Sequence, residues 1–201
     1  VLVLVLLYFK AARLWKLWFF LSVIFTLLIA FGAFIDQLLA LVLALIFALV
    51  KVYRPNVIIH NLTEVFIYGG LAAIFVPVLN VLSISMLLII ISIYDMIAVW
   101  KTKHMIKLAK FQSNLKVFAG LIIPYGKNKT AILGGGDIGF SLLFAGTMLK
   151  VYGLNSSLIA VAFSSLALLA LLIMAEKKKY YPAMPFISTG CFISLAIINL
   201  I

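Results

Sequence analysis

The sequence predicts an all-α fold, a polytopic bundle of transmembrane helices. Of its 201 residues, 67% are hydrophobic and only 10% are charged, whereas a soluble domain keeps about a quarter of its residues charged. The apolar residues gather in runs of about 20 residues, the length that a helix needs to cross a hydrocarbon core roughly 30 Å thick. A chain with so few polar residues cannot cover a soluble surface and belongs to the membrane class.

The apolar runs define the expected elements in order. Residues 1–9 form an incomplete apolar segment. Two interpretations stay open: the sequence is a trimmed or partly ordered version of something longer, or this element is only a helix end. A signal peptide is not indicated there, because the positive charge follows the apolar run instead of preceding it. Full spans are expected at 15–33, 37–53, 62–79, 81–100, 131–149, 155–175 and 182–201.

The cations test this count of spans. If the chain changes side at each span, 15 of its 16 Lys and Arg side chains fall on one side, and only Lys150 falls on the other. The larger set is Lys10, Arg13, Lys16, Lys51, Arg54, Lys101, Lys103, Lys107, Lys110, Lys116, Lys127, Lys129, Lys177, Lys178 and Lys179. Because cations mark the cytoplasmic side, we predict cytoplasmic basic loops and a C-terminus on the opposite side.

The net charge of +11 fits anionic lipid headgroups better than nucleic acid. Clustered cations next to membrane spans contact such headgroups, and the sequence carries no nucleic-acid-binding motif. The single cysteine, Cys191, excludes an internal disulfide and a multi-cysteine metal site, and we expect it to fill space inside a helix contact. No cofactor is predicted.

The basic stretch 101–130 contains one apolar piece, FQSNLKVFAGLIIPYG at 111–126. This piece is too short and too broken to be a further span. Three interpretations of this piece stay open: an interfacial or re-entrant segment, a strand at the membrane edge, and a solvated loop with one apolar anchor.

Three of the five acidic residues are expected to be solvated or to lie at a helix end. Asp36 falls in an outside turn, and Glu176 falls in a basic inside loop. Glu64 is expected at the cytoplasmic start of its span, where an acid favours the helix dipole. His60 and His104 are isolated, and we expect them at the interface.

Asp95 and Asp137 lie inside apolar spans. Asp95 comes six residues before Lys101, and Asp137 comes eight residues after Lys129, which places them roughly 9 Å and 12 Å from the same membrane edge. An intramembrane acid is costly unless it faces water or a partner. Two carboxylates at one depth can share a proton, so that one activates water and the other protonates a carbonyl oxygen. The pair predicts an aspartic-protease dyad. Two acids that are separately hydrogen-bonded inside helix contacts are the alternative.

Three glycines, Gly134, Gly135 and Gly136, directly precede Asp137. Glycine lets other backbone approach closely, or lets a helix start late or unwind beside the acid. Backbone groups exposed in this way could pair with an extended peptide. Tight packing of helices through small residues is the alternative.

Two further segments flank the acids. Tyr94 precedes Asp95 and offers a phenolic hydrogen bond, or serves as an interfacial aromatic residue. Pro182 and Pro185 in YYPAMPFIS predict a rigid helix start with unpaired N–H groups at the cytoplasmic edge.

These motifs resemble those of the presenilin/signal peptide peptidase family of GxGD intramembrane aspartyl proteases. The family signatures are YD, GxGD and PAL, in this order. Their counterparts here are Tyr94-Asp95, Gly134-Gly135-Gly136-Asp137 and Pro182-Ala183-Met184, with Met184 in the place of Leu, a change that conserves volume. The chain looks most like a compact archaeal presenilin homologue.

The resemblance covers about 81–201 and implies a division of labour. Residues 1–80 would hold scaffold and substrate-access helices, and 81–201 would be catalytic, with the cytoplasmic loop 101–130 between the motifs. Of the family's nine helices, about seven full spans and a partial one are visible, so the first helix and part of the second would be missing.

The resemblance also assigns roles. Asp95 and Asp137 would be catalytic, and the glycine segment, Tyr94 and the segment Pro182–Met184 would bind the substrate. Substrates would be transmembrane helices of other membrane proteins, locally unwound and cleaved within the bilayer. The chain would also contact membrane lipid. Whether it forms a homo-oligomer stays open.

Other classes fit the residues less well. A zinc protease needs HExxH, and an intramembrane serine protease needs a Ser and a His at matching depth; neither pattern is present. A prepilin-type peptidase also uses GxGD, but lacks the other two motifs. The alternative from a different class is a proton-coupled transporter that relays protons through Asp95 and Asp137 beside a broken helix.

Overall fold

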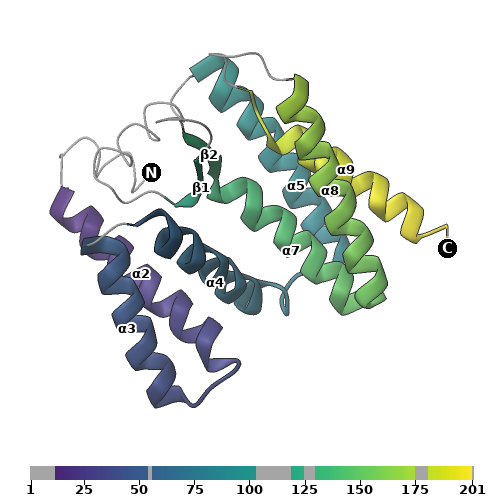
Figure 1. The fold of residues 1–201 in the computed structure, drawn as a ribbon. Helices are drawn as coiled ribbons and strands as arrows, with labels where there is room; N and C mark the ends of the chain where they lie inside the picture. Colours follow the sequence, from purple (N-terminus) through teal and green to yellow (C-terminus); the bar gives the residue numbers. More distant parts are fainter. Residues whose placement is uncertain (1–11, 54–55, 103–118, 125–129, 175–180, 201) are drawn as a thin grey trace. The chain divides into compact units, whose positions relative to one another are not determined.

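The computed structural model describes residues 12–53, 56–102, 119–124, 130–174 and 181–200 (Figure 1). The expected segment 1–9, Glu176 and the residues 103–118 of the basic loop lie outside this part. The helices are α2 (Ala12–Gly32), α3 (Gln37–Tyr53), α4 (Val57–Phe75), α5 (Val81–Met96), the π-helix η1 (Ile97–Thr102), α7 (Gly135–Tyr152), α8 (Leu154–Met174) and α9 (Met184–Ile198), and the strands are β1 (Gly120–Pro124) and β2 (Thr130–Gly134). The predicted all-α membrane bundle is confirmed, with one small two-stranded sheet added.

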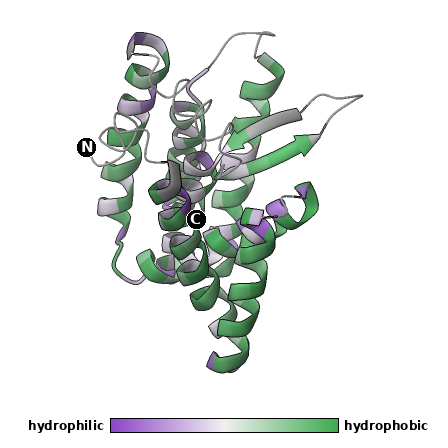
Figure 2. Ribbon diagram, turned by 90° about the vertical axis from the view of Figure 1, so that its left-hand side faces the viewer, coloured by the Kyte–Doolittle hydropathy of each residue, from purple (hydrophilic) through white to green (hydrophobic). Residues whose placement is uncertain are grey.

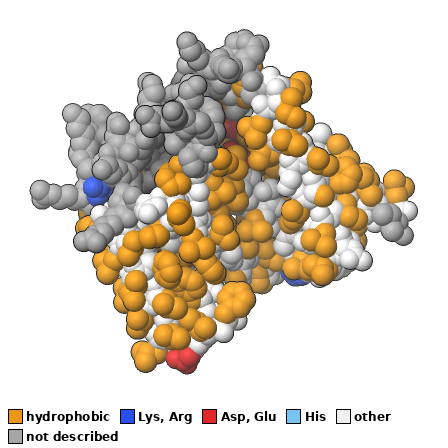
Figure 3. All heavy atoms as spheres, in the orientation of Figure 1, with side chains coloured by type: hydrophobic (Ala, Val, Ile, Leu, Met, Phe, Trp, Pro, Cys, Tyr) orange, Lys and Arg blue, Asp and Glu red, His pale blue; other side chains and the backbone are white. Residues whose placement is uncertain are grey.

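Four of the described helices are long and apolar enough to cross a membrane. They are Leu14–Gly32, Val57–Phe75, Val81–Lys101 and Leu154–Met174. The helices α3 and α9 are apolar but shorter, at 17 and 15 residues. Hydrophobic residues cover most of each helix (Figure 2), and in the space-filling view they also dominate the face that is seen (Figure 3). Such a surface suits lipid and not water.

Two predicted tight breaks between spans are confirmed, and each is held by a side-chain cap. Before α3, Asp36 Oδ2 accepts the N–H of Leu38 at 3.0 Å. Before α5, Asn80 and Ser83 form a reciprocal capping box, in which each side chain accepts the other residue's backbone N–H. Such caps satisfy N–H groups that a helix cannot bond itself.

The turn before α5 also has its carbonyls satisfied, by Lys150 at the end of α7. Its Nζ donates to the carbonyl oxygens of Val76, Pro77 and Leu79 at 3.3, 2.7 and 3.0 Å. The cation that stands alone in the predicted topology therefore caps the orphan carbonyls left where α4 ends.

The predicted bounds of two spans are wrong. The span expected at 62–79 is a helix from Val57 to Phe75, so Glu64 lies two turns inside it and not at its start. The span expected from 131 begins at Gly135, because 130–134 form the strand β2. Hydropathy alone cannot separate an apolar strand from an apolar helix end.

The chain divides into two compact units. The first comprises 1–71 and 109–133, and the second comprises 72–108 and 134–201. The division into scaffold and catalytic parts at residue 80 is functional and stays a prediction; the boundary between the compact units falls nine residues earlier, at 71/72.

In the first unit, α2 and α3 pack through small residues. Ala40, Ala44 and Ala48 recur every four residues along α3, and all three are fully buried against α2. A Cβ at Gly70 of α4 would overlap the carbonyl of Thr26 in α2. Helices in lipid associate by such close approach, since burial of apolar surface drives little there.

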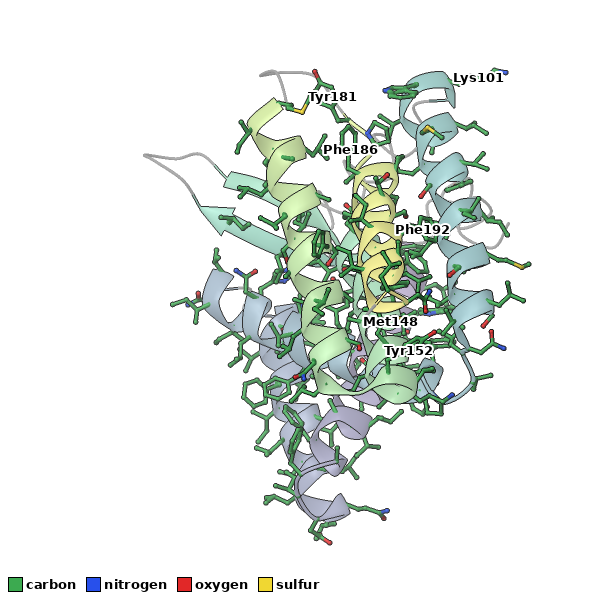
Figure 4. All side chains as sticks on the ribbon, turned by 90° about the vertical axis from the view of Figure 1, so that its right-hand side faces the viewer. Lys101, Met148, Tyr152, Tyr181, Phe186 and Phe192 are labelled. Atoms are coloured by element: carbon green, nitrogen blue, oxygen red, sulfur yellow. The ribbon has the colours of Figure 1, made fainter. Side chains whose placement is uncertain are left out.

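In the second unit, α5, α7, α8 and α9 share one core. Its fully buried members are Ile84, Leu88, Phe144, Met148, Ala160 and Cys191. Cys191 therefore fills space in the core, as expected. At the far end of α7 from its glycines, Tyr152 donates to the Asn199 side chain at 3.3 Å, after the end of α9. The opposite ends of these helices carry the candidate site (Figure 4).

Candidate active site

Asp95 lies near the end of α5 and is held by the start of α9. Its side chain is buried, and its Oδ2 accepts the backbone N–H of Met184 at 3.1 Å. The backbone of Ala183 also interacts with this carboxylate. The structure thus brings Asp95 together with two of the three residues of the predicted PAM segment.

The sequence around Pro185 explains why α9 offers an N–H to a carboxylate. Ala183 is the N-cap and has no side chain that can cap, and Pro185 lies in the first turn. The first N–H groups of a helix have no partner within it, and the helix dipole there favours negative charge. The carboxylate of Asp95 takes the place of the missing cap, so α9 both begins at the acid and orients it.

A second contact fixes the same two helices one turn away. Ser92 Oγ and Ser188 Oγ lie 2.8 Å apart, and both side chains are buried. Ser92 precedes Asp95 by three residues and Ser188 follows Met184 by four, so each lies on the same helix face as the contact above it. Pro182 is also fully buried.

Asp137 lies in the first turn of α7, directly after the glycines. Gly134 is the N-cap, with extended backbone. A Cβ placed on Gly134 would come within 3.1 Å of Asp137 Oδ2, whereas one on Gly136 would meet only the ring of Phe140, at 3.8 Å. Gly134 therefore keeps the space beside the carboxylate open. Gly135 begins the helix itself.

The two acids belong to one electrostatic site. They come from α5 and α7, which pack against each other in the second unit, and their charges interact. Tyr94 neighbours Asp95 in sequence, but about half of its side chain is exposed. In Figure 4, Tyr181 and Phe186, which flank the start of α9, lie at the same end of the unit as Lys101. This end carries the predicted pair of acids and the proline segment.

Directly after the acid, α5 becomes a π-helix. The π-helix η1 starts at Ile97, two residues after Asp95. Such wider turns are rare and occur often at functional sites. Sequence periodicity does not reveal this change.

A second polar cluster lies in the first unit, where the sequence predicted none. Lys51 Nζ is 2.7 Å from Glu64 Oε1, and each side chain is 1% exposed. His60 and Thr63 also contact this Lys51 at 3.3 and 3.1 Å. The predictions of an interfacial His60 and of Glu64 at a helix start are thus wrong, because both residues belong to one buried cluster with Lys51. His60 and Glu64 are four residues apart on one helix, and this spacing is the feature of the sequence that indicates the cluster.

The described residues contain no group of three or more His, Cys, Asp or Glu that could hold a metal ion. His104 lies outside them.

The chain matches a family model described as signal-peptide peptidase, presenilin aspartyl protease, over residues 1–137. The matched range covers the first seven described elements and ends on Asp137. No curated protein matches the chain.

Proposed function

This chain belongs to the family of signal-peptide peptidases and presenilin aspartyl proteases, and on that premise we propose that Asp95 and Asp137 are the catalytic pair of an intramembrane protease. The observation that carries the proposal is the pair of carboxylates near the end of α5 and at the start of α7, two helices that pack against each other. Acids are costly in such a place unless they have a task.

The chemistry needs a proton shared between the two carboxylates. The ionised one accepts a proton from water, whose oxygen attacks the carbonyl carbon of the scissile peptide. The protonated one donates to the carbonyl oxygen as the tetrahedral intermediate forms. The C–N bond then breaks, and the nitrogen leaves as an amine after taking up a proton. Asp95, oriented by the start of α9, and Asp137, with free space at Gly134, suit these two roles.

The proposed substrates are transmembrane helices of other membrane proteins. A helical peptide bond is shielded by its own hydrogen bonds, so the substrate must unwind locally before a carbonyl can be attacked. Strand addition to a sheet edge would hold an unwound segment. The strand β2 ends at Gly134, three residues before Asp137 in the sequence, and its backbone could pair with such a segment.

The remaining predicted residues are assigned to the walls of this site. Gly134, Gly135 and Gly136 leave room for the peptide backbone, the segment Pro182–Met184 bounds the site on the Asp95 side, and Tyr94 contributes from its half-exposed position. The basic loops are assigned to the cytoplasmic side on the charge distribution of the sequence.

One experiment separates a protease from a proton-coupled transporter. The purified chain is incubated in detergent with a labelled single-span peptide, and Asp137→Ala is compared with the wild type. A protease yields product fragments only with the wild type. Equal cleavage by both proteins, or no cleavage while proteoliposomes carry a proton flux that Asp137→Ala abolishes, contradicts the proposal.

A further inference from the structure

The strand β1 has one edge bonded to side chains of a helix. Asn61 of α4 donates from Nδ2 to the carbonyl of Ile122 at 2.7 Å, and its Oδ1 accepts the N–H of Ile122 at 2.9 Å. This pair of bonds reproduces what a residue of a neighbouring strand would offer. One side-chain amide therefore stands in for a third strand.

Gly120 is held in the same way, two residues earlier. Its N–H donates to Glu64 Oε2 at 3.2 Å, and its carbonyl lies 2.9 Å from His60 Nε2. Since a carbonyl only accepts, Nε2 carries the proton, and Nδ1 is left as the acceptor for Lys51. Gly120 has a φ of 145°, which a residue with a Cβ adopts rarely.

The pattern of the bonds identifies which edge of the hairpin is closed. Backbone groups of residues two apart in a strand point the same way, so Gly120 and Ile122 face α4, and Leu121 and Ile123 face β2. Pro124 falls in the first register, where its missing N–H costs the hairpin no bond. A two-stranded sheet has two edges, and with the edge of β1 bonded to α4 the remaining edge belongs to β2.

Lys51 holds the clamping side chains in place. Its ammonium contacts Glu64 Oε1, His60 Nδ1 and Thr63 Oγ1, so all three donors have partners. Glu64 thereby uses one oxygen for Lys51 and the other for Gly120. An ion pair buried among apolar helices is costly. Here its Glu64 also binds the N–H of Gly120 in β1.

We propose that His60, Asn61 and Glu64 are positioning residues that fix the register of the β1–β2 hairpin, and that this register selects which bond of the substrate is cleaved. The proposal rests on the proposed function. A slip by one residue turns every side chain of a strand to the other face, and β2 continues into Gly134 and Asp137 without a linking residue. A loosened clamp therefore changes which residues of the strand just before Asp137 pair with the substrate.

The test compares Asn61→Leu with the matched control Leu62→Ala. Leucine has the branched shape of asparagine but makes neither bond to Ile122. The Leu62 side chain is half exposed on the same helix. The probe is a single-span peptide of Leu and Ala with Lys at both ends, incubated with the full chain in detergent. The readouts are product masses, kcat and KM, and hydrogen exchange of the peptide that covers 119–124.

For Asn61→Leu we expect exchange of that peptide to rise at least about tenfold, as for a locally opened element. We expect cleavage to spread to neighbouring bonds, and kcat to fall roughly tenfold to a hundredfold while KM changes little, as for a displaced reacting group. Leu62→Ala should match the wild type in all readouts.

A pair of double variants separates positioning from simple stability. Both Lys51→Met/Glu64→Gln and Lys51→Met/Glu64→Leu remove the two charges, but only the first keeps an acceptor for the N–H of Gly120. The first should cleave at the wild-type bonds, and the second should spread its cleavage as Asn61→Leu does. A merely structural ion pair predicts the same products from both.

The remaining outcomes are decisive as well. Unchanged exchange in Asn61→Leu excludes the clamp, and raised exchange with unchanged products and kcat excludes its role in cleavage. If the wild type cleaves nothing, the proposed function and the positioning role fall together, while the exchange data still decide whether the clamp holds β1.

Discussion

At the scale of single residues, Asp95 has two tasks that substitution can separate. Its carboxylate caps the start of α9 through the N–H of Met184, and in the proposed mechanism it also exchanges a proton. A residue that accepts a hydrogen bond but cannot act as acid or base keeps the first task alone. Asn and Ala at this position therefore differ in stability, although both should be inactive.

We predict that Asp95→Asn keeps the thermal stability of the wild type, whereas Asp95→Ala loses about 1–2 kcal/mol, as for other lost caps. For a chain of this size that corresponds to a lower unfolding midpoint by roughly 2–8 °C. Thermal unfolding in detergent, followed by circular dichroism, measures the difference. Equal midpoints for the two variants would mean that the carboxylate does not hold α9.

Gly134 offers a second test at this scale. A Cβ there would lie 3.1 Å from Asp137 Oδ2, whereas a Cβ on Gly139 of the same helix meets nothing within 4 Å. We expect Gly134→Ala to lower kcat roughly tenfold to a hundredfold by displacing the carboxylate, and Gly139→Ala to leave it unchanged. Peptide cleavage under saturating substrate measures both. Similar rates for the two variants would refute the assigned role of Gly134.

At the scale of elements, the placement of the acids depends on how closely α9 packs on its neighbours. Gly190 brings α9 against α8, where an added Cβ would lie 2.5 Å from the carbonyl oxygen of Phe163 and 2.9 Å from the Cβ of Ala167. The same helix carries Met184 and Ser188 to α5. A displaced α9 therefore disturbs Asp95 from a distance.

We predict that Gly190→Ala destabilises the chain by about 1–3 kcal/mol, the usual cost of overpacking. The matched change Gly139→Ala adds the same methyl group to an open helix face and should be neutral or slightly stabilising. Chemical or thermal unfolding in detergent compares the two. A Gly190→Ala variant as stable as Gly139→Ala would show that the α8–α9 contact can relax without cost.

Elements of high hydropathy could be predicted from the sequence, but only some of their ends could. The break at Asn80 carries its own cap and agrees with the prediction, while α4 begins at Val57, five residues before the predicted start at 62. Asn56 accepts the N–H of Ile58 at the start of α4. His60 and Asn61 bond to β1. Partners far away in sequence leave no periodic pattern.

The candidate site shows the same contrast. Asp95 and Asp137 could be predicted because an acid inside an apolar span is rare, and the proline segment because proline marks helix starts. The bond from Met184 to Asp95, the π-helix after it and the Lys51–Glu64 pair depend on tertiary contacts. Only the first of these features involves residues that the sequence predicts for the site.

At the scale of the whole molecule, the proposed function depends on how the chain crosses the membrane. The predicted topology puts the turn at Asp36 outside and the end of η1 at Lys101 on the cytoplasmic side. Both side chains are exposed, and the single native cysteine, Cys191, is buried. Single cysteines can therefore report the side of each loop.

In a Cys191→Ser background, we expect Asp36→Cys to react with an impermeant maleimide in intact cells. Lys101→Cys should react only after the membrane is permeabilised. The mass shift of the labelled protein on a gel measures both. The reverse pattern would invert the topology, and labelling of both sites in intact cells would mean that the count of spans between them is wrong.

In the proposed mechanism Asp95 and Asp137 act as one catalytic unit, and a set of three variants tests this coupling. Cleavage rates of a single-span peptide are measured by mass spectrometry for Asp95→Asn, Asp137→Asn and the double variant, with the solvated Asp36→Asn as control. Groups that act as a unit have strongly non-additive effects. We predict that each single change lowers the rate by about 10²–10⁴-fold or more, that the double variant is no slower than either, and that Asp36→Asn is unaffected. Substantial activity in one single variant, or losses that multiply in the double variant, would contradict a dyad.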